Sequence, residues 1–364
     1  MGLETIPHKI AMNLLVFTPG FAADEKDSTC IPALQDWVEE GLLRGHSITI
    51  IAMHYPFKSS AYSWKGSQVF SLGGGNCRGL KKLPVFWSAF RLALSLHRKS
   101  AFDSVIACWM GDAALVSSWL SRLFRLPLTV VIMGQDALGN RYWPIFRNAR
   151  ALLVTPSAFA QKMLLERVGR DSFLIPFGLP SRILSVSRPL DRSIHMLSVG
   201  SVTEVKQPMK VLDLVLPVLA RNPEWQAVWV GAWVDESLLA ACRIRVLEAG
   251  LADRYRFLGE LPRHEAWALM ADARVLVHMA RHEAQGMVIR EGLALGCTVL
   301  TNGVGDVPDH PCMKVLYEGG ADDSVSLEQV VQTWTALGEN NPWPMSQNWM
   351  KYELRWDGEG GKLA

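Results

Sequence analysis

Short apolar runs alternate along the chain with stretches whose apolar residues recur at helical spacing. The run 10–17 predicts a strand, and 31–44 predicts a helix, because Leu34, Trp37 and Val38 follow that spacing. Further strands are expected at 47–52, 104–108, 128–133, 151–154 and 173–175. Strands that alternate with helices are typical of parallel sheets covered by helices on both faces.

A second series of the same kind follows. Its strands are expected at 195–199, 227–230, 256–258, 275–278 and 298–301, and its helices at 209–220, 235–249, 264–271 and after Gly286. Two series predict an α/β protein with two doubly wound domains, 1–178 and 179–345, and a tail, 346–364, that can cross back to the first domain. The stretch 177–193 contains two prolines and four serines and has no clear period, so it is the predicted linker. Because open α/β sheets bind ligands at the carboxyl ends of their strands, we expect a site in the cleft between the domains.

The composition excludes several classes of protein. Lys plus Arg number 37 and Asp plus Glu 35 among 364 residues, and this near balance argues against a nucleic-acid partner. A hydrophobic fraction of 49% excludes general disorder. The six cysteines form no CxxC pair, which predicts reduced thiols rather than a zinc or disulfide framework. The chain has no apolar run of about 18 residues and no convincing signal peptide, so we expect a cytoplasmic protein.

The most informative segment runs from Arg281 to Asp306. It places Glu283 and Glu291 on either side of Gly286, just where an apolar run predicts the start of a helix. A helix N-terminus has free backbone N–H groups and a partial positive charge, so a diphosphate can sit over Gly286, Met287 and Val288. Glu283 can then reach hydroxyl groups on one side of the diphosphate, and Glu291 can accept both hydrogen bonds of a ribose diol on the other.

This segment resembles the E-x7-E motif of the family 4 glycosyltransferases, the glycosyl transferases of group 1, which have the GT-B fold. Other stretches resemble further motifs of that family and occur in the same order along most of the chain. They are VFTPGF at 16–21, GH at 45–46, MGQD at 133–136, VGS at 199–201 with Lys206, LADRYRFLG at 251–259 and GCTVLTNGVGD at 296–306.

The resemblance implies two Rossmann-like domains that face each other across a cleft. It implies a retaining, metal-independent hexosyltransferase of polysaccharide biosynthesis. Such an enzyme moves a sugar from a nucleotide-diphosphate sugar, UDP- or GDP-linked, to a hydroxyl group of a glycan or lipid-linked saccharide. It needs no cofactor and no metal site.

The resemblance also assigns roles to single residues. Glu283 would hold the sugar hydroxyl groups, Glu291 the ribose, and Lys206 would neutralise the diphosphate. Gly20 and Ser201 would lie beside the donor, with Gly286, Met287 and Val288 at the helix start. Gly134 and Asp136 are assigned to the acceptor side, although Asp136 can equally cap the residues that follow it.

Four positions depart from the family pattern. Ser201 stands near the place of an Arg, Met133 replaces a His, Phe177 replaces an Asn, and Asp306 replaces a Gly. The departures at Ser201 and Met133 leave open the alternative that the protein is a catalytically silent GT-B-like scaffold or partner protein. Another GT-B chemistry, such as sugar-nucleotide epimerisation, is a third interpretation.

Two further features have competing interpretations. His278 and His282 precede Glu283, but 275–278 is expected to be a strand, so a helical zinc motif is disfavoured. Residues 66–102 contain no Asp or Glu, and within them 78–99 combines basic residues with an apolar helical pattern. Such a helix can pack on its own sheet, which we favour, or make a peripheral contact with the inner face of a membrane.

Overall fold

The computed structural model describes residues 11–137, 141–147, 150–307, 312–315, 321–334 and 345. The chain forms two compact units, Phe177–Met345 (unit 2) and the remainder, Met1–Pro176 with Ser346–Ala364 (unit 1). The segment 346–364, for which the sequence predicts a return to the first domain, lies outside the described residues.

Unit 1 is built on an eight-stranded sheet in the order β3-β4-β2-β1-β5-β6-β7-β8. All neighbouring strands are parallel except β3 and β4, which form an antiparallel hairpin. The strands are β1 (Asn13–Gly20), β2 (Ser47–Tyr55), β3 (Ser59–Trp64), β4 (Ser67–Leu72), β5 (Ser104–Cys108), β6 (Leu128–Val131), β7 (Leu152–Thr155) and β8 (Phe173–Leu174). The helices are α1 (Pro32–Leu43), α2 (Lys82–Lys99), α3 (Asp112–Phe124), α4 (Trp143–Arg147) and α5 (Ala158–Val168).

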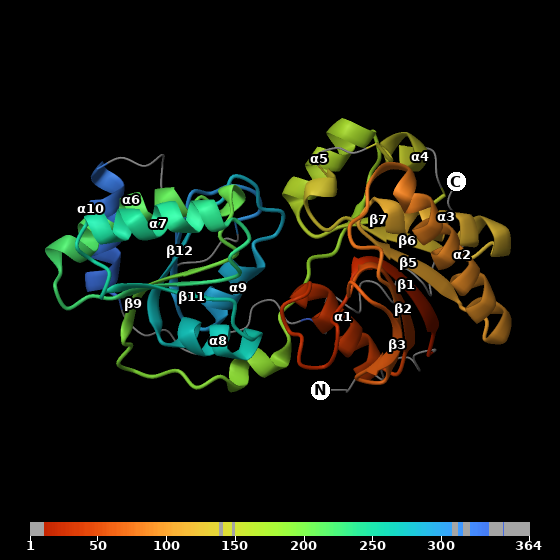
Figure 1. The fold of residues 1–364 in the computed structure, drawn as a ribbon, viewed down its shortest axis with the longest axis horizontal. Coiled ribbons are helices and arrows are strands. Elements are labelled where there is room, and N and C mark those ends of the chain that lie inside the picture. Colours follow the sequence, from red (N-terminus) through yellow and green to blue (C-terminus); the bar gives the residue numbers. More distant parts are fainter. Residues whose placement is uncertain are drawn as a thin grey trace, which may run out of the picture. The chain divides into compact units, whose positions relative to one another are not determined.

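Helices cover both faces of this sheet. One core cluster joins Phe86 of α2 and Leu120 of α3 to Leu15 and Phe17 of β1, and it also includes residues of α4 and α5. Helix α1 packs on the other face, as Figure 1 shows, and buries Leu34, Trp37 and Val38. Strands buried on both sides must be apolar throughout, which is why short continuous apolar runs marked them in the sequence.

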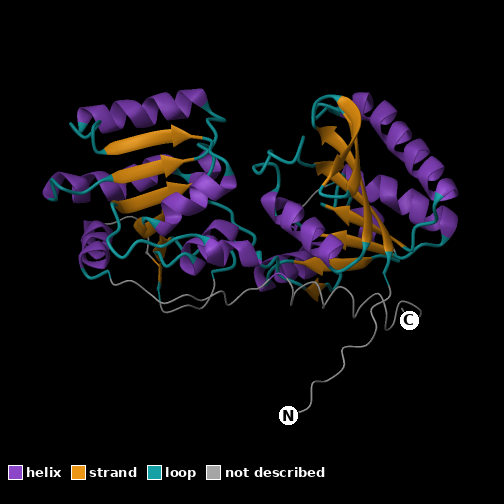
Figure 2. Ribbon diagram, turned by 90° about the horizontal axis from the view of Figure 1, so that it is seen from below, coloured by secondary structure: helices purple, strands orange, loops and turns teal. Residues whose placement is uncertain are grey.

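Unit 2 has a six-stranded parallel sheet in the order β11-β10-β9-β12-β13-β14. Helices α6, α7 and α10 lie on one face and α8 and α9 on the other, and Figure 2 shows the helical layers around the strands. The strands are β9 (Ile194–Val199), β10 (Ala227–Val230), β11 (Tyr255–Gly259), β12 (Ala273–His278), β13 (Thr298–Thr301) and β14 (Met313–Val315). The helices are α6 (Pro208–Arg221), α7 (Glu236–Glu248), α8 (Arg263–Ala271), α9 (Met287–Ala294) and α10 (Ala321–Gln332). Two doubly wound α/β units confirm the predicted fold class.

The stretch 177–193 is not a free linker, so that prediction is wrong. Leu179 and Ile183 are fully buried in the core beneath α8 and α9, and residues 181–185 form a 3-10 turn. The backbone N–H of Met345 donates to the carbonyl of Leu179 at 3.0 Å. A 3-10 turn lacks the period of an α-helix, which explains why the pattern showed none.

Helix α2 packs on its own sheet, as favoured from the sequence. Phe86, Ala89 and Ala93 are buried, whereas Trp87 is 60% exposed. Among the helices of the described residues, none has the length and apolar character needed to cross a bilayer.

We expect Ile183→Ala to destabilise unit 2 by about 2–5 kcal/mol, because it removes a fully buried side chain from a packed core. The neighbouring Leu184 is 37% exposed, so Leu184→Ala should change the free energy of unfolding by no more than about 0.5 kcal/mol. Urea denaturation of both variants measures the difference. Equal losses at the two positions would mean that the segment is not packed as described.

Candidate functional site

Three segments of unit 2 meet at Glu283, at the carboxyl edge of the sheet. Lys206 lies in the turn after β9, and its Nζ is 2.7 Å from Glu283 Oε2. His278, the last residue of β12, has Nε2 3.2 Å from the same oxygen. The backbone N–H of Gly286 donates to Oε1 at 3.3 Å. The structure therefore brings together Lys206, Glu283 and Gly286, three of the residues that the sequence marked as candidates.

Glu283 is held as a carboxylate. Burial by itself raises the pKa, but the hydrogen bond from His278 and the charge of Lys206 outweigh it and lower the pKa of Glu283 to about 2. Burial lowers the pKa of His278, so its imidazole is neutral at pH 7. Because an ionised carboxylate only accepts hydrogen bonds, the Nε2–H of His278 is the donor.

Helix α9 begins directly after this carboxylate. Gly286 occupies the N-cap with φ +63°. Because glycine has no side chain, the N-cap residue makes no capping hydrogen bond to the first N–H groups of the helix. The first N–H groups of a helix have no partner within it, and those of the half-buried Met287 and Val288 are among them. This helix start therefore offers backbone donors and a partial positive charge beside Lys206.

The loop after β13 closes against the segment that carries Glu283. A Cβ atom at Gly305 would lie 1.7 Å from the carbonyl oxygen of Glu283, and φ of Gly305 is +83°. Only glycine fits there without displacing the loop. Asp306, one of the departures from the family pattern, forms an ion pair with Arg290 of α9 at 2.5 Å. The unexpected aspartate thus has a partner that the sequence did not reveal.

Glu291 lies one turn further along α9 and is 8% exposed. Its Oε1 accepts from Arg263 Nε at 2.9 Å and Nη2 at 2.5 Å. Arg263 begins α8 and lies over the ring of Trp267 at 4.6 Å. Glu291 is therefore held apart from the Glu283 cluster, by an arginine 28 positions away that no sequence motif marked.

Ser201 is half-buried and follows Gly200 at the end of β9. The aliphatic stem of Lys206 passes close to Gly200, since a Cβ there would lie 3.4 Å from Lys206 Cγ. The absence of a side chain at Gly200 leaves room for this lysine. Arg281, another nearby cation, pairs with Glu204 at 3.0 Å.

The remaining predicted residues lie in unit 1. Gly20 ends β1 and is buried beside Tyr55. The buried carboxylate of Asp136 accepts backbone N–H bonds from Met110 at 2.9 Å, Met133 at 3.1 Å and Gly134 at 2.8 Å. Its contacts hold the loop after β6 in place, and burial raises its pKa.

Among the described residues, no group of three or more His, Cys, Asp or Glu side chains is arranged to hold a metal ion. His278 contributes to the site as the partner of Glu283. A polar residue at the buried end of a strand, five positions before Glu283, was the available sequence signal for this role.

Comparison with known proteins shows what the segment that carries the site is similar to. Residues 185–317 match the family described as glycosyl transferases group 1. Most of unit 2, including Lys206, Glu283 and Glu291, is thus similar to that family. Over 135 residues the chain is 26% identical to the GDP-mannose:cellobiosyl-diphosphopolyprenol alpha-mannosyltransferase of Xanthomonas campestris. That match covers 37% of this chain and about a third (34%) of the length of the curated relative.

Several solved structures share the fold of this protein over nearly the whole chain. Sucrose-phosphate synthase of Thermosynechococcus elongatus has a TM-score of 0.64 at 16% identity, covering 94% of this chain and 97% of its own. Anabaena HepE in complex with UDP and glucose has a TM-score of 0.63 at 17% identity, covering 88% and 89%. The fold is GT-B, as the sequence resemblance implied.

We expect Lys206→Met to raise the pKa of Glu283 above about 2, because the burial that opposes ionisation is then offset by less positive charge. In the unaltered protein Glu283 adds stability above its ordinary pKa of 4.5, and this contribution is lost as the pH falls towards about 2. The variant should lose part of that pH dependence.

Carbon-detected NMR titration of the glutamate carboxyl groups measures the pKa directly. Lys210→Met, at an exposed lysine of α6, is the matched control and should leave the titration of Glu283 unchanged. An unshifted Glu283 in Lys206→Met would contradict the ion pair.

Proposed function

We propose that this protein is a glycosyltransferase that moves a hexose from a nucleotide-diphosphate sugar to a hydroxyl group of a glycan or lipid-linked saccharide. The transfer retains the anomeric configuration and uses neither a metal nor another cofactor. The observation that carries the proposal is the Lys206–Glu283 ion pair, 2.7 Å long, at the start of α9 in a group 1 domain.

Several observations support a nucleotide-sugar donor. The relative from Xanthomonas campestris is named for GDP-mannose, and HepE was solved with UDP and glucose. Lys206 and the first N–H groups of α9 supply the positive charge and donors that a diphosphate requires. Glu291 lies on the same helix and can accept hydrogen bonds from a ribose diol.

The same groups can act on the reaction. As the bond between the sugar and the diphosphate breaks, negative charge grows on the leaving group, and Lys206 with the start of α9 stabilises it. Glu283, kept ionised by His278 and Lys206, accepts hydrogen bonds from sugar hydroxyl groups and positions the ring. The incoming hydroxyl group passes its proton to an oxygen of the departing phosphate on the same face, which gives retention. Retention and independence from metal follow from the family resemblance.

We expect Glu291→Gln to weaken nucleotide-sugar binding at least tenfold, because a carboxylate that accepts from the ribose is replaced by an amide. Gln keeps an acceptor for Arg263 but removes the opposing charge, so urea denaturation of the variant without ligand separates a loss of binding from a loss of folding. A thermal-shift panel of UDP-, GDP-, ADP- and dTDP-sugars identifies the donor, since a ligand at 100 times its Kd adds about 2.7 kcal/mol of apparent stability.

The matched control is Glu265→Gln, whose carboxylate lies on α8 with a side chain 52% exposed. It should bind like the unaltered protein. The panel is repeated in EDTA and in Mg²⁺, and the anomeric configuration of the product is determined by proton NMR. Unchanged affinity in Glu291→Gln would contradict the donor role, and an inverted product would contradict retention.

We further propose that the start of α2 makes a peripheral contact with an anionic membrane. Leu83 and Trp87 of α2 are 56% and 60% exposed, and their spacing of four residues places them on one side of the helix. Leu80, in the 3-10 turn just before α2, is 82% exposed. Arg78 and Lys81 flank them, and both are exposed. A basic, apolar helix face binds anionic lipid through buried apolar surface and charge attraction together.

Leu83→Glu should reduce binding to vesicles that contain phosphatidylglycerol and phosphatidylcholine at least tenfold, because a carboxylate resists burial and is repelled by the lipid charge. Co-sedimentation measures this. Leu123→Glu, at an equally exposed leucine of α3 (56%), is the control. Equal losses in both variants, or equal binding to pure phosphatidylcholine, would exclude this surface as the contact.

A further inference from the structure

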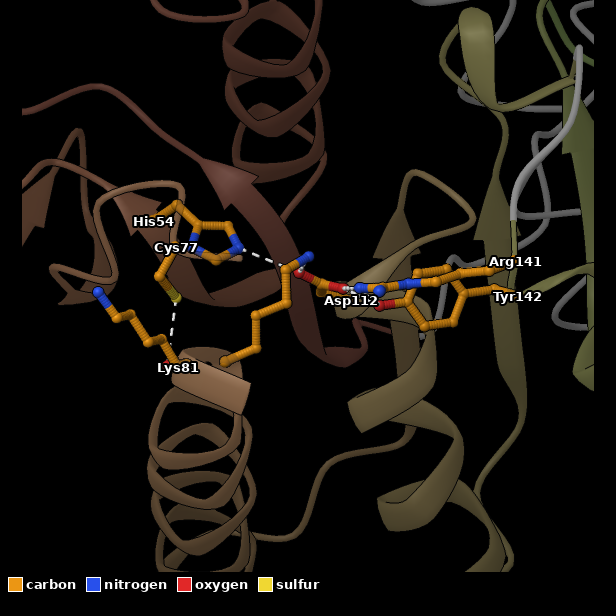
Figure 3. A network of polar contacts seen from close by, with 7 residues as sticks. His54, Cys77, Lys81, Asp112, Arg141 and Tyr142 are labelled. Atoms are coloured by element: carbon orange, nitrogen blue, oxygen red, sulfur yellow. Dashed lines mark hydrogen bonds and ion pairs between the residues drawn. The ribbon is translucent and has the colours of Figure 1, made fainter. Parts of the chain in front are cut away.

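A second polar cluster lies at the carboxyl edge of the unit 1 sheet, and its centre is Asp112. Asp112 is the first residue of α3 and follows β5, while His54 lies near the end of β2. These strands flank β1, where the strand order reverses direction. Ligands of open α/β sheets bind at such a point. Figure 3 shows His54 on one side of Asp112 and Arg141 with Tyr142 on the other.

The Asp112 carboxylate is surrounded by donors. Lys82 Nζ and the hydroxyl group of Tyr142 donate to it, His54 Nε2 lies 3.3 Å from Oδ2, and Arg141 Nη2 lies 3.8 Å from Oδ1. Although burial raises its pKa, the hydrogen bonds from these groups and the charge of Lys82 hold the pKa of Asp112 well below its usual range. Both oxygens are occupied, so this carboxylate positions the cations around it and is not itself the group that meets a ligand.

The capacity left in the cluster consists of donors. Lys82 uses one ammonium N–H on Asp112, and Arg141 donates from Nη2 to Tyr142 at 2.9 Å while lying over its ring at 5.0 Å. The side chain of Arg141 is 61% exposed and that of Lys82 18%. Two positive charges face one negative charge, which leaves the cluster cationic and rich in N–H groups.

Two further observations point to a ligand. Nδ1 of His54 is fully buried and has no hydrogen-bond partner among the described residues, so the network is not closed on itself. The segment 66–102, which supplies Lys82, contains no Asp or Glu, so it has no carboxylate that would repel an anion. An anion with several oxygen atoms fits this arrangement, because Arg and Lys together recognise phosphate oxygens through charge-assisted hydrogen bonds.

We infer that Lys82 and Arg141, held in place by Asp112, bind a phosphate or diphosphate ester of the acceptor substrate. The inference rests on the proposed function, because it assigns this anion to the acceptor rather than the donor. Leu83, the residue after Lys82 in α2, is 56% exposed, so a lipid chain attached to the phosphate would find apolar surface beside the cations. The ester can therefore be a lipid-linked diphosphate or a water-soluble sugar phosphate.

The test measures binding of farnesyl diphosphate, farnesol and inorganic pyrophosphate to the full chain by isothermal titration calorimetry. The double variant Lys82→Ala/Arg141→Ala should bind farnesyl diphosphate at least tenfold more weakly, with farnesol unaffected. Lys206→Ala separates this site from the donor site and should keep the affinity for farnesyl diphosphate. Lys162→Ala, at a side chain 73% exposed on α5, controls for general loss of charge.

If the double variant loses binding of both farnesyl diphosphate and pyrophosphate, the result supports the site and shows that the diphosphate group suffices for binding. Loss of farnesyl diphosphate alone supports it with a lipid-linked source. Unchanged farnesyl diphosphate affinity in the double variant, or an equal loss in Lys162→Ala, overturns it. The readout is independent of transfer, so a protein that binds nucleotide sugars but fails this test keeps its proposed function. A protein that passes this test but binds no nucleotide sugar would keep the anion site and lose the proposed function.

Discussion

The carboxylate of Glu283 is the constraint on which the carboxyl edge of unit 2 depends. It is largely removed from water, and it stays ionised because Lys206, His278 and the N–H of Gly286 come to it from three different segments. A backbone hydrogen bond from Arg281 to Val205, 2.8 Å long, ties two of these segments together directly. Removing one partner of such a group leaves a buried charge uncompensated, which costs far more than an exposed ion pair contributes.

Unit 1 uses the same physical device with a different set of residues. Asp112 is also a partly buried carboxylate at the carboxyl edge of a sheet, and it too is surrounded by cationic and neutral donors. In both units an anion that belongs to the protein orders flexible cationic side chains in advance. Because Lys and Arg lose much rotamer freedom when they are fixed, holding them before a ligand binds reduces the cost of binding it.

The sequence predicted best where one local property decides the structure. Strands at 104–108, 227–230 and 298–301 have the predicted bounds, because burial on both faces demands a continuous apolar run. The β3–β4 hairpin was not predicted, since its partly exposed strands contain many serines and no such run. Pairs distant in the sequence, such as Arg263 with Glu291 and Arg290 with Asp306, leave no local pattern. The prediction of a linker at 177–193 was wrong for a related reason: Leu179 and Ile183 are buried by contacts with α8 and α9, which lie far from them in the sequence.

The hydrogen bond between Met345 and Leu179 has a topological consequence. The chain enters unit 2 at Phe177 and leaves it after Met345, so this bond joins the two ends of the unit. The two ends of unit 2 therefore already touch. A short peptide could close those ends into a ring at little entropic cost, because closure entropy grows with the length of the loop to be closed. Unit 2 should thus tolerate circular permutation, as is common for domains whose termini are close together.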